Sequence, residues 1–154
     1  MPELKYAKYI YTQPKASKYK KMAEGPSLDT VLMMNGENVP GAFHVHCAWV
    51  HPGPNPGVYE AHVHPHDEIL GFIGTNPDDN SDLGAEATLW IGDEKYVLTK
   101  SFMAFLPKGL VHCPLTVINV QRPILHFDIQ LASGRPEFTW VKDLPAKKVK
   151  GAKK

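Results

Sequence analysis

Three of the eight histidines in the chain stand at alternate positions of one short stretch, as His62, His64 and His66. Alternate residues of a β-strand project from the same face, so the rings of His62 and His64 can point at one place. Two imidazoles that converge in this way can bind a single metal ion. Pro65 interrupts regular strand pairing, and the chain can bend there. The stretch therefore predicts part of a metal site, with a further ligand from a residue that follows.

Two acidic residues, Asp67 and Glu68, follow these histidines directly. Glu68 opens the apolar run Glu68–Gly74, which reads EILGFIG, whereas Asp67 falls in the turn before it. We therefore expect Glu68 to be the carboxylate that joins the metal site. His66 is expected at the rim of a pocket or in solvent beside Asp67, and a role as a ligand in place of His64 stays open.

A second motif lies in the stretch FLPKGLVHCP, where Pro107, Gly109 and His112 follow the order P-x-G-x-x-H. Pro107 and Gly109 favour a tight turn between two strands, and His112 stands just past it. Together, the stretches Gly57–Gly74 and Pro107–His112 resemble the two sequence motifs of the cupin superfamily. Each spacing to a flanking glycine is one residue shorter than in the usual form.

The resemblance covers roughly residues 40–130 and implies an all-β, single-domain jelly-roll barrel with a metal ion inside. Carried over position by position, it implies the metal ligands His62, His64, Glu68 and His112. It does not imply a substrate, because cupins include dioxygenases, decarboxylases, isomerases, lyases and proteins that only bind ligands.

The implied ligand set has consequences for the metal. Four protein ligands in an octahedral shell leave two positions for substrate, water or dioxygen. Fe(II) is the first expectation for three imidazoles and one carboxylate, with Mn, Ni, Co, Zn and Cu as alternatives. A closed four-ligand zinc site would instead be structural.

Three classes of function follow. The first is a metal-dependent oxidoreductase of the dioxygenase type, acting on a small organic molecule in a pocket walled by Leu70, Phe72, Phe105 and Trp90. The second is a redox-neutral lyase, decarboxylase or isomerase, in which the metal is a Lewis acid. The third is a metal-binding or ligand-binding protein without catalysis.

The candidate catalytic residues for proton transfer are His46, His126 and Tyr59, with His44 as a further candidate. The stretch GAFHVHCAWV alternates, so His44 and His46 share one face and Phe43 lies on the other. Either face can be the inside of the barrel. The polar loop TNPDDNSDLG is long enough to be a lid or rim, or plain surface.

The rest of the chain is predicted to form nine or ten short strands separated by Gly, Pro, Asn and Asp turns, including a hairpin turn at Gly92-Asp93. Residues 15–23 can form one exposed turn or short helix. We expect a basic extension with the first strand or strands over 1–39, the metal-binding barrel over 40–131, and a lysine-rich extension over 132–154.

Composition limits the partners. The net charge is +1, yet residues 1–21 hold six lysines and residues 141–154 another six. No recognition-helix or aromatic-platform pattern accompanies them, which argues against nucleic acid as a partner. No run is long and apolar enough to cross a membrane. The two cysteines are expected as free thiols in a cytoplasmic protein. A small-molecule substrate is expected, and the resemblance implies a homodimer.

Overall fold

The computed structural model of the chain describes residues 5–12, 28–53, 58–134 and 137–142. The segment expected to form a short helix, 15–23, lies outside the described residues. Within the described ranges, one 3-10 turn covers Ala7–Tyr9, and all other regular structure is strand. The strands are β1 (Leu28–Met34), β2 (His44–Val50), β3 (Val58–Tyr59), β4 (His62–Val63), β5 (Glu68–Ile73), β6 (Asp82–Ile91), β7 (Glu94–Lys100), β8 (Phe102–Leu106), β9 (His112–Ile118), β10 (Ile124–Gln130) and β11 (Thr139–Trp140).

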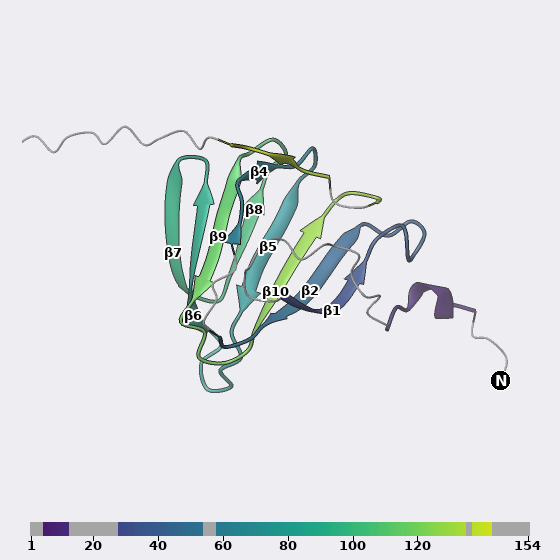
Figure 1. Cartoon of the computed structure of the whole chain (residues 1–154). Coiled ribbons are helices and arrows are strands. Elements are labelled where there is room, and N and C mark those ends of the chain that lie inside the picture. Colours follow the sequence, from purple (N-terminus) through teal and green to yellow (C-terminus); the bar gives the residue numbers. More distant parts are fainter. Residues whose placement is uncertain (1–4, 13–27, 54–57, 135–136, 143–154) are drawn as a thin grey trace, which may run out of the picture.

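The strands form two sheets, and every pairing is antiparallel (Figure 1). One sheet has the order β1-β2-β10-β5-β8, and the other has the order β11-β4-β9-β6-β7, with β3 beside β9. Strands that are neighbours in a sheet are often far apart in the chain, as β2 and β10 are. This double-sheet jelly roll confirms the predicted all-β class.

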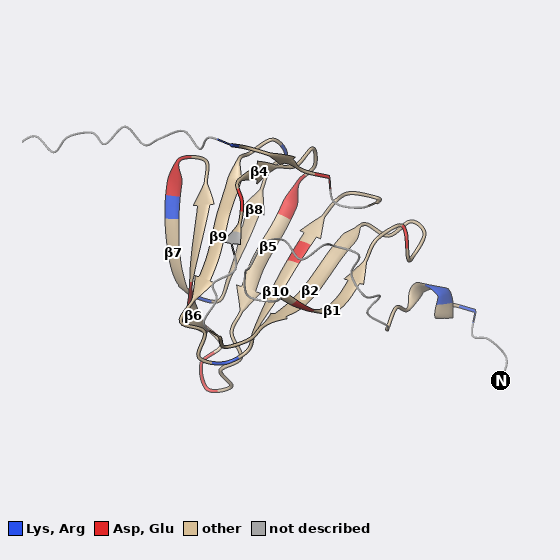
Figure 2. Cartoon of the chain, in the orientation of Figure 1, with Lys and Arg blue, Asp and Glu red and all other residues tan. Residues whose placement is uncertain are grey.

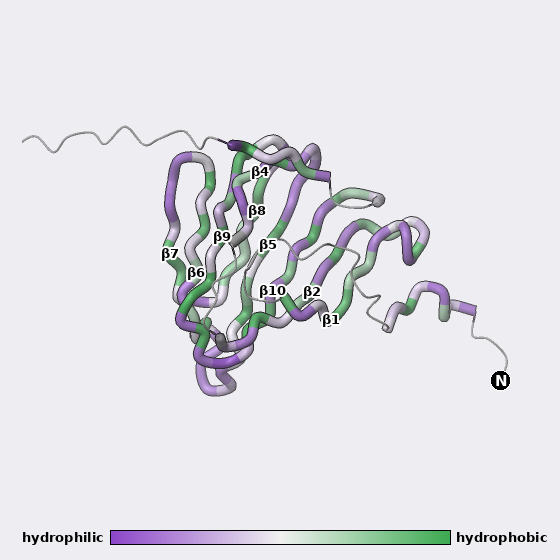
Figure 3. Tube along the Cα trace, in the orientation of Figure 1, coloured by the Kyte–Doolittle hydropathy of each residue, from purple (hydrophilic) through white to green (hydrophobic). Residues whose placement is uncertain are grey.

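The core lies between the two sheets, where the inward positions of both meet. Buried apolar residues of both sheets meet there, and Figure 3 shows apolar stretches within strands of both sheets. The buried cluster contains Val50, Leu70, Phe72, Leu83, Ala85, Ala87, Leu89, Leu106, Cys113, Leu115, Val117 and Ile124. Burying a side chain of the Val, Leu, Ile or Phe type contributes roughly 1.5–3 kcal/mol, so this cluster holds the sheets together.

The structure decides which face of β2 is inside. His44 and Ala48 are buried, whereas Phe43 is 49% exposed. The histidine face therefore points into the space between the sheets, and the aromatic face points outward.

Two of the residues expected to line the pocket, Phe105 and Trp90, point away from the core. Phe105 is 61% exposed, because β8 turns Leu106 inward and Phe105 outward. Trp90 lies between Leu89 and Ile91, which both join the core, so its side chain is on the opposite face. Leu70 and Phe72 are buried, as expected.

The loop considered as a lid lies at the wrong end of the barrel. It follows Ile73, at the opposite end of β5 from Glu68, so about 17–20 Å of strand separates it from that carboxylate. It is organised instead around Asp82, which bonds to Asn76 and to Arg122. The predicted hairpin turn at Gly92 is confirmed, with a positive φ of 58° that favours glycine.

A short segment near the end of the described chain, residues 137–142, lies against β4 and was not predicted. We call this segment the strap. β11 pairs with β4, with Trp140 opposite His62 and Thr139 opposite Val63. The N–H of Val141 also donates to the carbonyl of Ala61. No helix within the described residues is long and apolar enough to span a membrane. Both cysteines are free thiols.

Candidate metal centre

The structure brings together the four side chains that the two motifs single out. His62 is on β4, His64 follows β4, Glu68 opens β5 and His112 opens β9, so both sheets contribute. One ligating atom from each residue lies within 4.8 Å of the others. All four residues are buried, with exposed fractions of 2% to 9%.

The turns of the two motifs are tied to each other, which fixes how close the strands approach. The N–H of Gly109 donates to the carbonyl of His64 across 2.9 Å, and Gly109 has a positive φ of 77°. The N–H of Lys108 donates to Asp67 Oδ1 across 2.9 Å. Asp67 therefore positions the second motif and lies outside the cluster, as the sequence predicted.

Each of the three rings is held through its Nδ1. The Nδ1 of each ring lies at hydrogen-bond distance from a backbone carbonyl: His62 with Glu60 at 2.6 Å, His64 with Glu137 at 2.6 Å, and His112 with Leu110 at 3.0 Å. A carbonyl oxygen only accepts, so each Nδ1 must carry the hydrogen. In a neutral ring, the Nε2 then carries a lone pair, which is the form that binds metal ions.

The carboxylate of Glu68 meets these lone pairs. Its Oε2 lies 3.0 Å from His112 Nε2 and 3.3 Å from His64 Nε2. All three atoms are buried and lack a hydrogen-bond partner. Lone pairs that face each other at this distance need a shared cation, either a proton or a metal ion. The donor set and its geometry could hold a metal ion.

The protonation states agree with this arrangement. Burial alone would raise the pKa of Glu68, but its contacts with His112 and His64 lower that pKa to about 2. Burial lowers the pKa of His62 to about 4, so its ring is neutral. Burial would also lower the pKa of His64, yet bonds to Glu68 and the carbonyl of Glu137 raise it. The proton shared with Glu68 in the absence of metal therefore belongs mainly to His64.

His66 does not join the cluster directly. Its Nε2 lies 2.9 Å from Gln130 Oε1, and Gln130 Nε2 donates to Glu68 Oε1 across 3.1 Å. Gln130 thus links His66 to the carboxylate. Sequence reasoning missed Gln130, although it occupies the last inward position in the alternation of β10.

A second polar cluster lies on the same inner face, and it contains two of the candidate catalytic residues. His46 and His126 both approach Asp128, at 3.0 Å and 3.7 Å. His44 Nε2 lies 3.1 Å from the other oxygen of Asp128. Figure 2 shows one acidic stretch in β10 and one in β5, which are interior strands of the five-stranded sheet. Asp128 was not singled out from the sequence.

Tyr59, the third catalytic candidate, lies near this cluster. The centroid of its ring is 6.3 Å from that of His126. Burial and the nearby carboxylate of Asp128 raise the pKa of Tyr59, so its hydroxyl keeps its proton.

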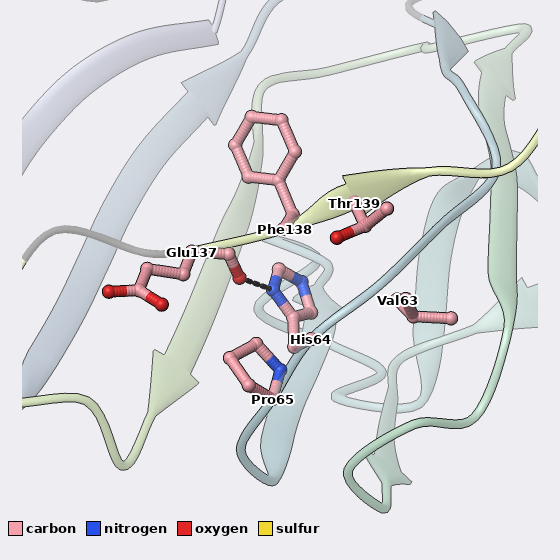
Figure 4. Close-up of a pocket in the computed structure, with 6 residues that line it drawn as sticks. All are labelled: Val63, His64, Pro65, Glu137, Phe138 and Thr139. Carbon is pink, nitrogen blue, oxygen red and sulfur yellow. Dashed lines mark hydrogen bonds between the residues drawn. The ribbon is translucent and has the colours of Figure 1, made fainter.

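A pocket opens beside His64, between β4 and the strap that contains β11 (Figure 4). Its volume is about 610 Å³, and its lining residues are Val63, His64, Pro65, Glu137, Phe138 and Thr139. The rings of Phe138 and Trp140 also lie 5.9 Å and 5.6 Å from that of His62. The strap therefore covers one side of the histidine cluster.

Comparison with known proteins gives the fold. No family model and no curated protein matches the chain. Among solved structures, an oxalate oxidase in complex with glycolate matches with a TM-score of 0.53 and 14% identity, covering 86% of this chain and 63% of that one. Peruvianin-I, a cysteine peptidase from Thevetia peruviana latex, matches with a TM-score of 0.52 and 16% identity, covering 88% and 78%. A cupin protein from Bacteroides fragilis matches with a TM-score of 0.46 and 17% identity, covering 79% and 90%.

The chain therefore shares the fold of the oxalate oxidase and of peruvianin-I, in agreement with the jelly-roll barrel that the two motifs imply. It spans 63% of the length of the oxalate oxidase. An oxidase and a peptidase share this fold, so the reaction must be argued from the side chains of this chain.

Proposed function

We propose that the chain is a metal-dependent enzyme in which His62, His64, Glu68 and His112 hold one divalent ion. The observation that carries the proposal is the set of buried, unpartnered acceptor atoms on His64, Glu68 and His112. Leaving such atoms unpaired costs about 1–3 kcal/mol each, and one cation satisfies all of them together.

Fe(II) is the proposed ion, because nitrogen and carboxylate ligands with open positions suit it, and Mn, Co, Ni, Zn and Cu are the alternatives. When bound, such an ion supplies Lewis-acid or redox chemistry to a small molecule beside it. The backbone carbonyls of Glu60, Leu110 and Glu137 would hold the three rings in their binding orientation.

The proposed substrate is a small organic molecule between the sheets, within reach of the second cluster. His126 donates its Nδ1–H to the carbonyl of Gly71 across 3.1 Å, so its Nε2 carries the lone pair. Burial lowers the pKa of His126, and the neutral ring can take up a proton. Burial and Asp128 raise the pKa of Tyr59, so its hydroxyl keeps its proton and can donate a hydrogen bond to the substrate. We propose that His46, His126 and Tyr59 are the catalytic side chains that surround the substrate.

A dioxygenase-type oxidation is the first proposed reaction. Redox-neutral lyase, decarboxylase or isomerase chemistry is the second, and it is favoured by the neutral base of His126 standing near the protonated Tyr59.

Metal analysis and oxygen consumption test the proposal together. Protein purified without chelator is assayed for bound metal, then given a panel of small organic acids and aromatic compounds with and without O₂. Stoichiometric Fe with substrate-dependent oxygen uptake supports the oxygenase. Turnover without O₂ supports the redox-neutral reaction. Protein that binds no divalent metal, or that binds it and turns over nothing in the panel, contradicts the proposed enzyme.

A further inference from the structure

The cluster around Asp128 is built from two neighbouring strands in fixed register. His46 on β2 is directly opposite Asp128 on β10, and His126 stands two residues before Asp128 on the same strand. One ligating atom from each of the three residues lies within 4.8 Å of the other two. His126 is buried, and His46 and Asp128 are mostly buried.

Each of the three side chains uses its other polar atom on a separate partner. His46 Nε2 lies 3.0 Å from Thr30 Oγ1. His126 Nδ1 donates to the carbonyl of Gly71 across 3.1 Å. The remaining oxygen, Asp128 Oδ1, lies 3.1 Å from His44 Nε2. Three supporting contacts therefore turn His46 Nδ1, His126 Nε2 and Asp128 Oδ2 toward one place.

We propose that His46 Nδ1, His126 Nε2 and Asp128 Oδ2 form a second binding site for a divalent transition-metal ion, which when bound takes up the His126 lone pair that the empty site leaves free for proton transfer. Two imidazoles and one carboxylate on one side, with the other positions open, is a ligand set that such ions take up. Supporting hydrogen bonds to the far atom of each ligand are a general feature of metal sites, because they fix the tautomer and the ring orientation.

The lone pair of His126 is the strongest argument for a cation. Its Nε2 faces Asp128 Oδ2 at 3.7 Å with no proton on either atom, because its Nδ1 holds the hydrogen. Histidine contacts hold the pKa of Asp128 well below its usual range despite burial, so the carboxylate is available as a ligand.

The tautomer of His46 distinguishes a metal site from a cluster held by hydrogen bonds alone. If His46 donates Nε2–H to the hydroxyl of Thr30, its Nδ1 is a lone pair aimed at Asp128 Oδ2 across 3.0 Å, and a cation is needed between them. If the proton is on Nδ1, it bridges to Asp128 and no metal ion is needed.

The two sites are separate. Asp128 and Gln130, which bonds to Glu68, are two residues apart on β10, so their Cα atoms are about 7 Å apart. No residue belongs to both groups of ligands. Each site can therefore be removed without touching a ligand of the other.

A metal titration tests the inference on the full chain. Chelated, metal-free protein is titrated with Co²⁺, and binding is followed by calorimetry and by the visible absorption of the bound ion. The parent protein should bind about two equivalents per chain, whereas D128N and E68Q should each bind about one. The control is D29N, because Asp29 contacts His51 at 3.3 Å in an exposed pair that resembles the second site but lies on the surface.

A second, milder variant keeps the test valid if D128N does not fold. Replacing Thr30 with valine keeps the shape of the side chain and removes only the partner of His46 Nε2. T30V should weaken the second equivalent by about 10- to 100-fold and leave the first unchanged. A parent protein that binds about one equivalent, retained in D128N and T30V, overturns the second site and leaves the cluster to proton transfer. If that single equivalent is lost in E68Q and kept in D128N, the ion is bound at the first site. The first site therefore stands or falls separately from the second.

Discussion

The side-chain amide of Gln130 donates to Glu68 Oε1 across 3.1 Å, which leaves Oε2 as the oxygen that faces the histidines. The same amide group lies 2.9 Å from His66 through its oxygen. Gln130 therefore orients the carboxylate and at the same time connects it to a histidine that does not enter the cluster.

Replacing Gln130 with methionine should weaken metal binding by about 10- to 100-fold, because the size of the side chain is kept while the donor to Glu68 is lost. The unpaired Oε1 should also lower the free energy of unfolding by about 1–3 kcal/mol. Competition with a chelator of known affinity measures the first effect, and urea denaturation measures the second. Unchanged metal affinity in Q130M would show that Gln130 does not orient the carboxylate.

Removal of His112 should abolish metal binding at the site of His62, His64 and Glu68 while the protein stays folded. His112 supplies a buried Nε2 with no other partner, and the core around it is predominantly apolar. We expect H112A to bind metal more than about 100-fold more weakly, beyond the usual effect of an outer partner. H51A is the matched control, because His51 is an exposed histidine. Metal content by mass spectrometry, with circular dichroism for the fold, gives the answer, and a metal-replete H112A would refute the ligand assignment.

Strand alternation predicted that His62 and His64 share one face, and the start of the apolar run favoured Glu68 over Asp67. The full set with His112 came from the resemblance of the two motifs to the cupin superfamily. Asp128 and Gln130 could not be singled out in the same way. Each is one polar residue on a strand, and its meaning depends on which strands lie beside β10.

The wrong assignment of two pocket residues and the failure to predict the strap have a similar origin. Phe105 and Trp90 were assigned to the pocket because they are aromatic, but the inward or outward phase of β8 and β6 is set by their neighbours in the sheets. The strap was missed because β11 has only two residues, too few for a periodic signal.

Metal affinity should rise with pH across the titration of His64. Its pKa is raised in the metal-free protein by Glu68 and the carbonyl of Glu137, and this proton must leave before Nε2 can bind an ion. The ion bound to His64 at pH 6 should therefore displace the proton of that ring, whereas His62, with a pKa lowered to about 4, should release none. Calorimetry in buffers with different ionisation enthalpies counts the protons. Binding without proton release at this pH would contradict the assignment.

In the metal-free protein, the ion pair of Glu68 and His64 should stabilise the fold over a limited pH range. The pKa of Glu68 is depressed to about 2, so its contribution is present above its unfolded value of 4.5 and is lost as the pH falls toward 2. The pKa of His64 is raised, so its contribution is present below 6.5 and is lost as the pH rises through its folded value. We expect the largest stabilisation by this pair between about pH 4.5 and 6.5. Comparing the thermal unfolding of metal-free parent and E68Q across pH measures it, and a difference that does not narrow outside this window argues against the pair.

The strap should be needed for tight metal binding, because it supplies the carbonyl that orients His64. The carbonyl of Glu137 accepts from His64 Nδ1 across 2.6 Å, and β11 fixes that segment against β4. A chain ending at Gly134 lacks this acceptor, so the ring can rotate and its lone pair is no longer held toward Glu68. We expect metal affinity to fall by about 10- to 100-fold, as for the loss of other outer partners. A chain ending at Lys142 is the control, because it keeps the strap and removes only the residues beyond it. Equal affinities for the two truncated chains, measured by chelator competition, would mean that His64 is oriented by the barrel alone.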